Sequence, residues 1–478
     1  MKATSQIKPA DLMKGIRRLF EIASAKTALL ERRWRIEDGA PVFTVAGRYS
    51  ARGWTQWTQG FQYGNALLCF DLTGDMSLLK IGRDQTVGQM TEHLTNLGVH
   101  DHGFNNLSTY GQLRRLMLEQ KIAQNDWELR YYEQALKTSG AVQAARWTTL
   151  PNGQGYIHSF NGPHSLFIDT LRTVRICGLA HVLGHSLFGE QDVKINLLAR
   201  SLTHSSMAAH WNVYYGEGRD IYDTPELRGR TAHEAVFNPV SGTFRCPSSQ
   251  QGYSAFSTWT RGLAWAMLGF AEELEFANSL SESEFGHSGV MSKSDAISTL
   301  TKAALATCDF YISQGTASDG ICYWDTGAPN LYRLGEWRDS EADPYNPYEP
   351  VDSSASAIAA QGLIRLGVAL GVEGERYLQA GLAVTKRLLE EPYLSTDEKH
   401  EGILLHSIYH RPNGWDYIPS NLVSPAGESS MWGDYHMLEL GLLVSRISEG
   451  SYYSFFGSAS AGRKMETSEL GTKGSTQK

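Results

Sequence analysis

Carboxylate and aromatic side chains are the residues in this sequence whose types and positions could carry chemistry. The motifs G-x-S-x-G, H-E-x-x-H and G-x-x-x-x-G-K-[ST] are absent, and Gly153-Gln154-Gly155 lacks the rest of a dinucleotide fingerprint. Sugar rings stack their C–H faces on Trp, and glycoside chemistry uses carboxyl groups to move protons. The candidate stacking residues are Trp54, Trp57, Trp259, Trp265 and Trp432. Taken singly, a Trp more often fills a protein core than binds a sugar.

Helices must position these residues, and two kinds of helix alternate along the chain. Outer helices carry one apolar stripe opposite a charged face, as Leu12, Ile16, Leu19 and Ala23 illustrate. Inner helices begin with aromatic and polar residues and continue with Gly, Ala, Leu and few charges, which indicates burial on all sides. The expected outer helices cover residues 9–30, 78–96, 125–145, 191–213, 293–314 and 374–391. The expected inner helices cover residues 57–70, 105–118, 166–185, 257–275, 351–368 and 431–447.

Six antiparallel helix pairs that close on themselves predict an all-α fold, an (α/α)6 barrel or six-hairpin toroid. The polar starts of the inner helices would then gather at one mouth of the barrel. A non-catalytic helical-repeat scaffold could show the same alternation, but it would not need polar and aromatic residues at every inner helix start. Because no linker interrupts the chain, we expect one catalytic domain over residues 1–450. Residues 458–478 are rich in Ser, Gly, Thr and Lys, which predicts a disordered tail.

Five motifs then follow one another in an order that is similar to that of the unsaturated glucuronyl hydrolases, a family of the glycoside hydrolase 88/105 type. They are Trp57-Thr58-Gln59-Gly60-Phe61-Gln62-Tyr63-Gly64, His100-Asp101-His102-Gly103-Phe104, Gln251-Gly252-Tyr253 with Ser257-Thr258-Trp259-Thr260-Arg261-Gly262-Leu263-Ala264-Trp265, Asp352-Ser353-Ser354-Ala355-Ser356, and Met431-Trp432-Gly433-Asp434-Tyr435. The resemblance covers about residues 50 to 445. It implies a glycoside hydrolase that removes a terminal unsaturated uronic acid from oligosaccharides by hydrating its C4=C5 double bond.

The resemblance implies catalytic roles for two carboxylates. Asp101 lies just before one expected inner helix and Asp169 at the start of the next, where an Asp on position alone is more often a helix N-cap. The resemblance implies instead that Asp169 donates the proton and activates water, and that Asp101 assists it. Two carboxyl groups in one partly dry pocket cannot both ionise cheaply, so one pKa should rise and that group can act as an acid.

The resemblance also implies the residues that bind the substrate. Arg261 and Gln251 would meet the substrate carboxylate, although on charge alone Arg261 would more often be a structural ion-pair partner. His204 or His210 would complete the pocket, although a lone His is more often an ordinary surface or core residue. The remaining expected contacts are His100 of the His-Asp motif and the indoles of Trp57, Trp259, Trp265 and Trp432.

Two departures from the family pattern keep other functions open. Leu171-Arg172-Thr173-Val174-Arg175 follows Asp169 and places extra positive charge beside the expected acid. The stretch Gly216 to Val240, with Arg219, Arg228, Arg230, His233 and Glu234, is longer than usual and would be either a solvated loop or a lid over the sugar. Either departure would fit an intact β-glucuronidase on the same barrel. A non-catalytic carbohydrate-binding relative is the third alternative, and the presence of both Asp101 and Asp169 argues against it.

Composition limits the remaining functions. With 43 Lys and Arg against 51 Asp and Glu, the chain has no electrostatic footprint for nucleic acid, and we expect neither that partner nor a membrane. The five cysteines show no C-x-x-C spacing, which predicts free thiols in a reducing compartment, with no metal and no cofactor. The first eighteen residues lack the apolar run of a signal peptide, so the cytoplasm is the expected location. The oligomeric state stays open.

Overall fold

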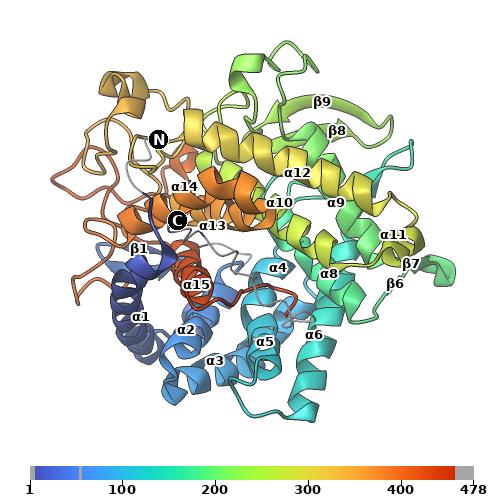
Figure 1. Cartoon of the computed structure of the whole chain (residues 1–478), viewed down its shortest axis with the longest axis horizontal. Coiled ribbons are helices and arrows are strands. Elements are labelled where there is room, and N and C mark those ends of the chain that lie inside the picture. The colour runs from blue at the N-terminus through green and yellow to red at the C-terminus, as the bar shows by residue number, and fades with distance from the viewer. Residues whose placement is uncertain (1–5, 53–55, 458–478) are drawn as a thin grey trace, which may run out of the picture.

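The computed structural model describes residues 6–52 and 56–457, and helices dominate it (Figure 1). The inner helices are α2 (Gln59–Thr73), α4 (His102–Asn105) with α5 (Gln112–Leu118), α7 (Thr170–Thr173) with α8 (Arg175–Val182), α10 (Thr260–Ser279), α13 (Ser353–Leu370) and α15 (Met431–Ser448). The outer helices are α1 (Met13–Arg33), α3 (Met76–Gln89), α6 (Asp126–Ala145), α9 (Leu197–Trp211), α12 (Lys293–Phe310) and α14 (Glu375–Leu388). A short helix, α11 (Glu282–Ser288), lies between α10 and α12.

Contacts between successive inner helices close a ring. Helix α2 contacts α4, which contacts α7; α7 contacts α10, α10 contacts α13, α13 contacts α15, and α15 returns to α2. Each outer helix packs on an inner neighbour, as α3 does on α2 and α14 on α13. One apolar core therefore runs from Leu12 on the N-terminal side to Phe455 on the C-terminal side. This closure confirms the predicted (α/α)6 barrel.

Short strands interrupt the expected helices where backbone pairing competes with helix formation. The strands are β1 (Pro41–Val45), β2 (Arg48–Ala51), β3 (Trp147–Thr149), β4 (Gly155–Ile157), β5 (Ser165–Phe167), β6 (Leu187–Phe188), β7 (Lys194–Ile195), β8 (Glu234–Asn238) and β9 (Thr243–Ser248). They form the antiparallel sheets β1-β2, β3-β4, β5-β8-β9 and β6-β7. The inner helix expected to begin at residue 166 begins only at Thr170, because Leu166 and Phe167 pair with β8. Hydrophobic spacing cannot separate so short an apolar strand from a helix.

Two further boundaries differ for local reasons. The outer helix expected from residue 191 begins at Leu197, since the Asn196 side chain accepts a hydrogen bond from the Ala199 N–H and caps it. The inner helix expected from residue 105 begins three residues earlier, at His102, and contains a π-helical turn over Leu107–Gly111. The described structure therefore places the start of this helix directly after Asp101.

One stretch, Ser353–Leu388, is long and apolar enough to cross a membrane by length and composition. It consists of α13 and α14, which turn back on each other through a 3-10 turn at Gly371–Gly374 and pack together. Most of it is buried inside the barrel. The buried core helices of a globular domain pass the same test, so the stretch is weak evidence for a membrane span.

The barrel axis holds buried charges and is closed at the end opposite the inner helix starts. Arg172, fully buried, lies 3.0 Å from a carboxylate oxygen of Glu272 and 2.7 Å from one of Glu439. Beyond α15 the chain folds back over this end, and the Tyr453 hydroxyl donates a hydrogen bond of 2.8 Å to Glu439. Arg365 holds the same segment by donating to the Tyr453 carbonyl at 3.1 Å. The segment Ser451–Gly457 thus plugs the bottom of the barrel, and only the other mouth is left for a site.

Candidate active site

A pocket of about 190 Å³ opens at the mouth where the inner helices begin. Its aromatic wall consists of Trp57, Phe104, Phe160, Trp259, Trp265, Tyr409 and Trp415. Its polar wall consists of His100, Asp101, Asp169, Gln250, Gln251, Arg261, His410 and Asn413. The pocket therefore joins stacking surfaces to two carboxyl groups, which is the combination that binding and cleaving a sugar requires.

Close packing of α4 on α7 brings Asp101 and Asp169 into this pocket. A side chain on Gly103 would collide with the backbone of Thr173, so only glycine allows the two helix starts to approach this closely. The Thr173 hydroxyl donates to the His100 carbonyl at 2.6 Å, and the Gln143 amide donates to the same oxygen at 2.9 Å. The residue before Asp101 is thereby tied to the neighbouring inner helix and to α6.

Neither carboxylate caps the helix that it precedes. The side chains of Asp101 and Asp169 make no cap hydrogen bond to α4 or α7. Asp352, in the equivalent place before α13, does cap its helix, because it accepts from the Ser354 and Ala355 N–H groups. Helix capping therefore explains why an Asp precedes α13, but it does not explain Asp101 and Asp169.

His100 lies between the two carboxylates and sets their charge. Its Nε2 is 3.4 Å from Asp169 Oδ1 and 3.9 Å from Asp101 Oδ1. Burial alone would lower the pKa of His100, but the two carboxylates outweigh it and raise that pKa above its usual value. Burial raises the pKa of Asp101. Burial also acts to raise the pKa of Asp169, yet the hydrogen bond and charge of His100 outweigh it and hold that pKa below its usual value.

The direction of these shifts differs from the sequence-based expectation for the acid. Of the two carboxyl groups, Asp101 has the raised pKa, and Asp169 has the lowered pKa and is the ionised member of the pair. The reason is the position of the imidazole, which lies nearer to Asp169. The three groups titrate as a unit, so a proton needed at Asp169 can come from His100.

Replacing His100 with Gln should destabilise the protein more at pH 5.5 than at pH 8.5. The folded-state pKa of His100 is raised, so its contribution to stability is complete below the unfolded pKa and is lost as pH rises through the folded value. Thermal unfolding at the two pH values measures this difference. His158→Gln is the matched control, because burial lowers the pKa of His158 to about 4 and its pH dependence should have the opposite sign. If His100→Gln lost the same stability at both pH values, the result would contradict a protonated imidazole between the two carboxylates.

Arg261 lines the pocket but is already paired. Its guanidinium lies 2.9 Å from Asp352 Oδ2, donates to the Tyr409 carbonyl at 2.7 Å and also donates to the Ile408 carbonyl. It donates at 3.0 Å to Gln251 Oε1, which leaves the Gln251 amide N–H groups available to a ligand. The structural ion pair weighed from the sequence is therefore present, and the charge of Arg261 still acts on Asp169 across the pocket.

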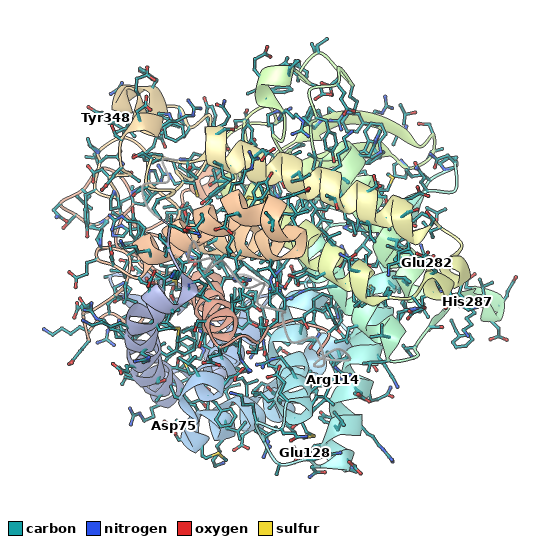
Figure 2. All side chains as sticks on the ribbon, in the orientation of Figure 1. Asp75, Arg114, Glu128, Glu282, His287 and Tyr348 are labelled. Atoms are coloured by element: carbon teal, nitrogen blue, oxygen red, sulfur yellow. The ribbon has the colours of Figure 1, made fainter. Side chains whose placement is uncertain are left out.

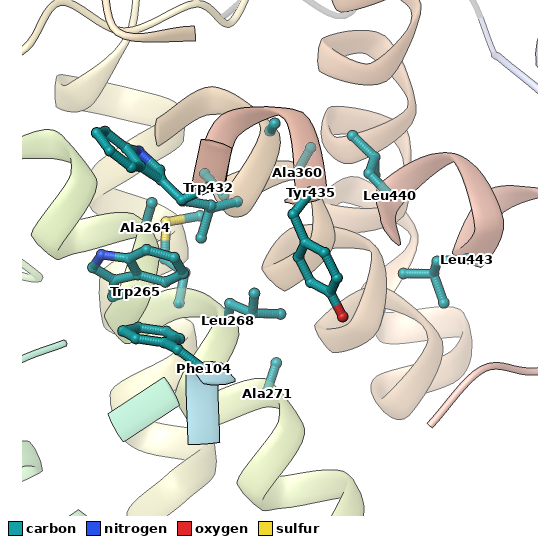
Figure 3. Packing of buried hydrophobic residues seen from close by; sticks show 14 of the residues in the cluster. Phe104, Ala264, Trp265, Leu268, Ala271, Ala360, Trp432, Tyr435, Leu440 and Leu443 are labelled. Carbon is teal, nitrogen blue, oxygen red and sulfur yellow. The ribbon is translucent and has the colours of Figure 1, made fainter. Parts of the chain in front are cut away.

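Three of the expected indoles line the pocket and one does not. Trp57, Trp259 and Trp265 belong to its wall. Trp432 is fully buried behind it, stacks on Trp57 with centroids 5.1 Å apart, and donates its indole N–H to the Ser354 hydroxyl. Figure 3 shows Trp265 between the rings of Phe104 and Trp432. Trp432 does not line this pocket, so the expectation that it contacts the sugar is wrong. Because α15 packs tightly on α13, the Trp432 ring lies behind Trp57 and supports it. Trp54 lies outside the described residues.

Neither expected histidine lines the pocket. His204 is fully buried in α9, where its Nδ1 accepts the Ile157 N–H at 3.2 Å, and burial lowers its pKa to about 3. His210 is exposed at the end of the same helix and packs its ring on Trp211. Both assignments are corrected because α9 is an outer helix: His204 is buried behind the pocket wall, and His210 is exposed at the end of the helix.

Sequence reasoning missed the supporting histidine, which is His233. Its ring packs against Trp259 at 4.7 Å, and its Nδ1 accepts the backbone N–H groups of Gln250 and Gln251 at 3.0 and 3.4 Å. Its Nε2 is buried with no hydrogen-bond partner within the described structure. Burial lowers its pKa to about 4, so it is neutral at working pH. The only sequence signal near it was the short apolar run Ala235-Val236-Phe237, which forms part of β8.

The two departures from the family pattern add no charge to the pocket. Arg172 and Arg175 lie below it on the barrel axis, where Glu272 is 3.0 Å from each. Extra positive charge beside the acid is therefore not found. Within Gly216 to Val240, Asp223 accepts N–H groups from Gly216, Glu217 and Arg219 and folds the stretch on itself. The stretch ends in β8, so its contribution is to support the Gln250–Gln251 wall from outside, and a lid is not observed.

In the described part of the chain, no group of three or more His, Cys, Asp and Glu side chains is placed to hold a metal ion.

No family model matches the sequence, but the chain is similar to individual proteins. The chain is 26% identical over 425 residues to an unsaturated glucuronyl hydrolase of Bacillus sp. (strain GL1), which covers 85% of this chain and 91% of that protein. It is 22% identical over 415 residues to an unsaturated chondroitin disaccharide hydrolase of Streptococcus pyogenes serotype M1, covering 84% of each.

Comparison of the fold with solved structures finds proteins of the same kind. The crystal structure of the unsaturated glucuronyl hydrolase from Bacillus sp. GL1 superposes with a TM-score of 0.68 at 22% identity, covering 94% of this chain and 100% of that one. A helical barrel whose single mouth holds two uncapped carboxylates among stacked indoles defines the protein as a glycoside hydrolase. Over most of its length the chain is similar to unsaturated glucuronyl hydrolases.

Proposed function

We propose that the protein removes a terminal 4,5-unsaturated glucuronyl residue from oligosaccharides by hydrating its double bond. The observation that carries the proposal is the group Asp101, His100 and Asp169 at the closed end of an aromatic pocket, where neither carboxylate has a helix-capping role. The names of the relatives support the same substrate class, since they refer to unsaturated glucuronyl and unsaturated chondroitin disaccharide substrates.

Substrate entry prepares Asp169 to act as the acid. The hydrogen bond and charge of His100 keep Asp169 ionised before the substrate enters. A uronic acid carries its own carboxylate into the pocket and displaces water, and both effects favour the protonated form of a nearby carboxyl group. His100, with its raised pKa, faces Asp169 and supplies the proton. Asp101 binds the reacting ring from the other side of the imidazole.

The reaction then needs one proton and one water. Asp169 transfers its proton to C4, and positive charge develops at C5 and the ring oxygen. Water adds its oxygen to C5 and returns a proton to the Asp169 carboxylate, so the catalyst is restored. The resulting hemiketal opens at its C5–ring oxygen bond, and the remaining hemiacetal at C1 releases the aglycone. Stacking on Trp259 and Trp265 and hydrogen bonds from Gln251 hold the ring in place for these steps.

The intact β-glucuronidase is disfavoured by the positions of the residues that suggested it. Arg172 and Arg175 are neutralised by buried carboxylates, and the Gly216 to Val240 stretch stands behind the pocket wall. Neither reshapes the pocket for a saturated sugar. We also propose the cytoplasm as the location, on the ground that all five cysteines are free thiols.

A lyase-generated disaccharide and its saturated counterpart, tested side by side, decide between these functions. Hydration consumes the conjugated double bond, so ultraviolet absorbance should fall with turnover of the unsaturated substrate, and the saturated one should be inert. In ¹⁸O-labelled water the label should enter at C5 of the product. Turnover of the saturated glucuronide with label at C1 and no loss of absorbance from the lyase product would overturn the proposal in favour of direct glycosidic cleavage.

A further inference from the structure

A second aromatic groove lies on the outside of the barrel between α3 and α6. It has a volume of about 540 Å³ and is lined by Arg83 and Val87 of α3 and by Trp127, Glu128 and Tyr131 of α6, among others. In Figure 2 the labelled Glu128 lies at the end of α6 that borders the groove. Trp127 is 73% exposed, the most exposed aromatic side chain among the described residues. Packing within the fold gives no reason for a large apolar ring in that place.

The exposed indole has a fixed orientation. The rings of Trp127 and Tyr131, one helical turn apart, lie with their planes 9° apart and their centroids 5.8 Å apart. Tyr131 in turn packs on the buried Tyr132 at 6.0 Å, so the pair is anchored to the core. A pre-oriented ring loses little side-chain entropy when a flat apolar surface stacks on it.

The charged side chains beside the rings form pairs of opposite charge. Arg83 Nε lies 3.6 Å from Glu128 Oε2 and has no hydrogen-bond partner in the described structure. Glu128 accepts from the Tyr132 hydroxyl at 3.0 Å, and Lys80 pairs with Asp84 at the rim. Because each positive charge has a negative partner, the groove favours a neutral ligand that carries both donors and acceptors next to an apolar face. A sugar residue has this composition.

A second copy of the chain fits the groove less well. A stable protein interface buries about 800 Å² on each partner with an apolar centre. Here the exposed large apolar side chains of the groove are Trp127 and Val87, and charged residues surround them. The volume falls instead within the range of small-ligand sites, about 300–1,000 Å³.

The groove is separate from the active site. Helix α6 contacts the pocket near its C-terminal end, where Gln143 donates to the His100 carbonyl. Trp127 lies at its other end, about 24 Å away at 1.5 Å rise per residue. A disaccharide in the pocket cannot reach the groove. A ligand there is a different saccharide, or a distant part of a long one.

We propose that the groove between α3 and α6 is a second saccharide-binding site, in which a neutral sugar residue stacks on Trp127 and bonds to Arg83 and Glu128. It extends the proposed function by holding the enzyme on glycan material while the pocket acts on chain ends. The geometry that carries it does not depend on which bond the pocket breaks.

Calorimetric titration with neutral hexasaccharides of glucose, mannose, xylose and galactose, and with a saturated hyaluronan hexasaccharide, tests the site. We expect at least one neutral hexasaccharide to bind, and Trp127→Ala to weaken that binding at least tenfold. Tyr332→Ala is the matched control, because Tyr332 is 72% exposed and lies outside the groove. Turnover of the unsaturated disaccharide, measured on the same samples, should be equal in all three proteins.

Three outcomes overturn the proposal. They are the absence of any Trp127-dependent binding of a neutral hexasaccharide, Trp127-dependent binding of the anionic hexasaccharide alone, and a dimer in sedimentation of the wild type that Trp127→Ala dissociates, which would assign the groove to a second copy. Failure of the proposed function has a different signature: the wild type would not consume the unsaturated disaccharide, whatever the hexasaccharides show.

Discussion

Replacing Asp169 with Asn is expected to lower kcat on a lyase-generated disaccharide by about 10²-fold or more, because positioned acid–base catalysis typically contributes that much. The amide can neither deliver a proton to C4 nor take one from water. The protein should still fold, since Asp169 caps no helix and Asn has nearly the same shape, but it loses the stability that the charge of His100 gives to the Asp169 carboxylate. Loss of ultraviolet absorbance measures kcat, and thermal unfolding measures stability.

The control for this variant is Asp75→Asn. Asp75 is an exposed N-cap of α3, and Asn caps a helix equally well, so both activity and stability should be retained. Near wild-type turnover by a folded Asp169→Asn protein would remove Asp169 from the role of acid. The acid would then be sought at Asp101, because burial raises its pKa.

Replacing Arg172 with Met should destabilise the barrel by about 3–5 kcal/mol, the usual effect of removing one partner from a buried ion pair. Arg172 is fully buried between Glu272 and Glu439. Burial already raises the pKa of Glu272 to about 7, even with Arg172 and Arg365 beside it. Burial acts to raise the pKa of Glu439 as well, but Arg172 outweighs it and holds that pKa below its usual value. Without the guanidinium, Glu439 loses its nearest cation and Glu272 keeps only Arg175 and Arg365, so the pKa of both carboxyl groups should rise further.

The loss should therefore be larger at pH 8 than at pH 6. A carboxyl whose folded-state pKa is raised costs no stability below its unfolded pKa and costs progressively more as pH rises toward the folded value. Urea unfolding at the two pH values measures the difference. Lys80→Met, which removes the exposed partner of Asp84, should change stability by less than about 1 kcal/mol. An Arg172→Met protein as stable as the wild type at pH 8 would show that the two carboxylates do not depend on this arginine.

The sequence predicted the barrel because its helices carry strong signals. Outer stripes such as Leu12, Ile16 and Leu19 are buried as expected, and inner helices such as α13 are buried on all sides. Short strands were missed, since a three-residue segment such as Ser165–Phe167 is too short to show a period and becomes a strand only through its partner β8.

The site was predictable where a motif sits on an inner helix start, as for Asp101, Asp169 and Trp259. It was not predictable where chain segments distant in sequence meet. His410 and Trp415 enter the pocket from a loop before α15, and His233, just before β8, supports the pocket wall by packing on Trp259. Spacing could not tell that Arg172 points along the axis to Glu439, which lies 267 positions further along the chain. Neither could it tell that α9 faces the wall from outside, which removes His204 and His210 from the pocket.

The plug that Ser451–Gly457 forms at the bottom of the barrel has a kinetic consequence. With Tyr453 bonded to Glu439 and Arg365, no route leads from the pocket through the barrel, so substrate and both products share one doorway. A polymer cannot be threaded through and advanced residue by residue. Each catalytic cycle must therefore empty the pocket through this doorway, and the shortened chain is not a substrate again, because it no longer carries a 4,5-unsaturated end. The released aglycone leaves past the incoming substrate, and it should act as a competitive inhibitor.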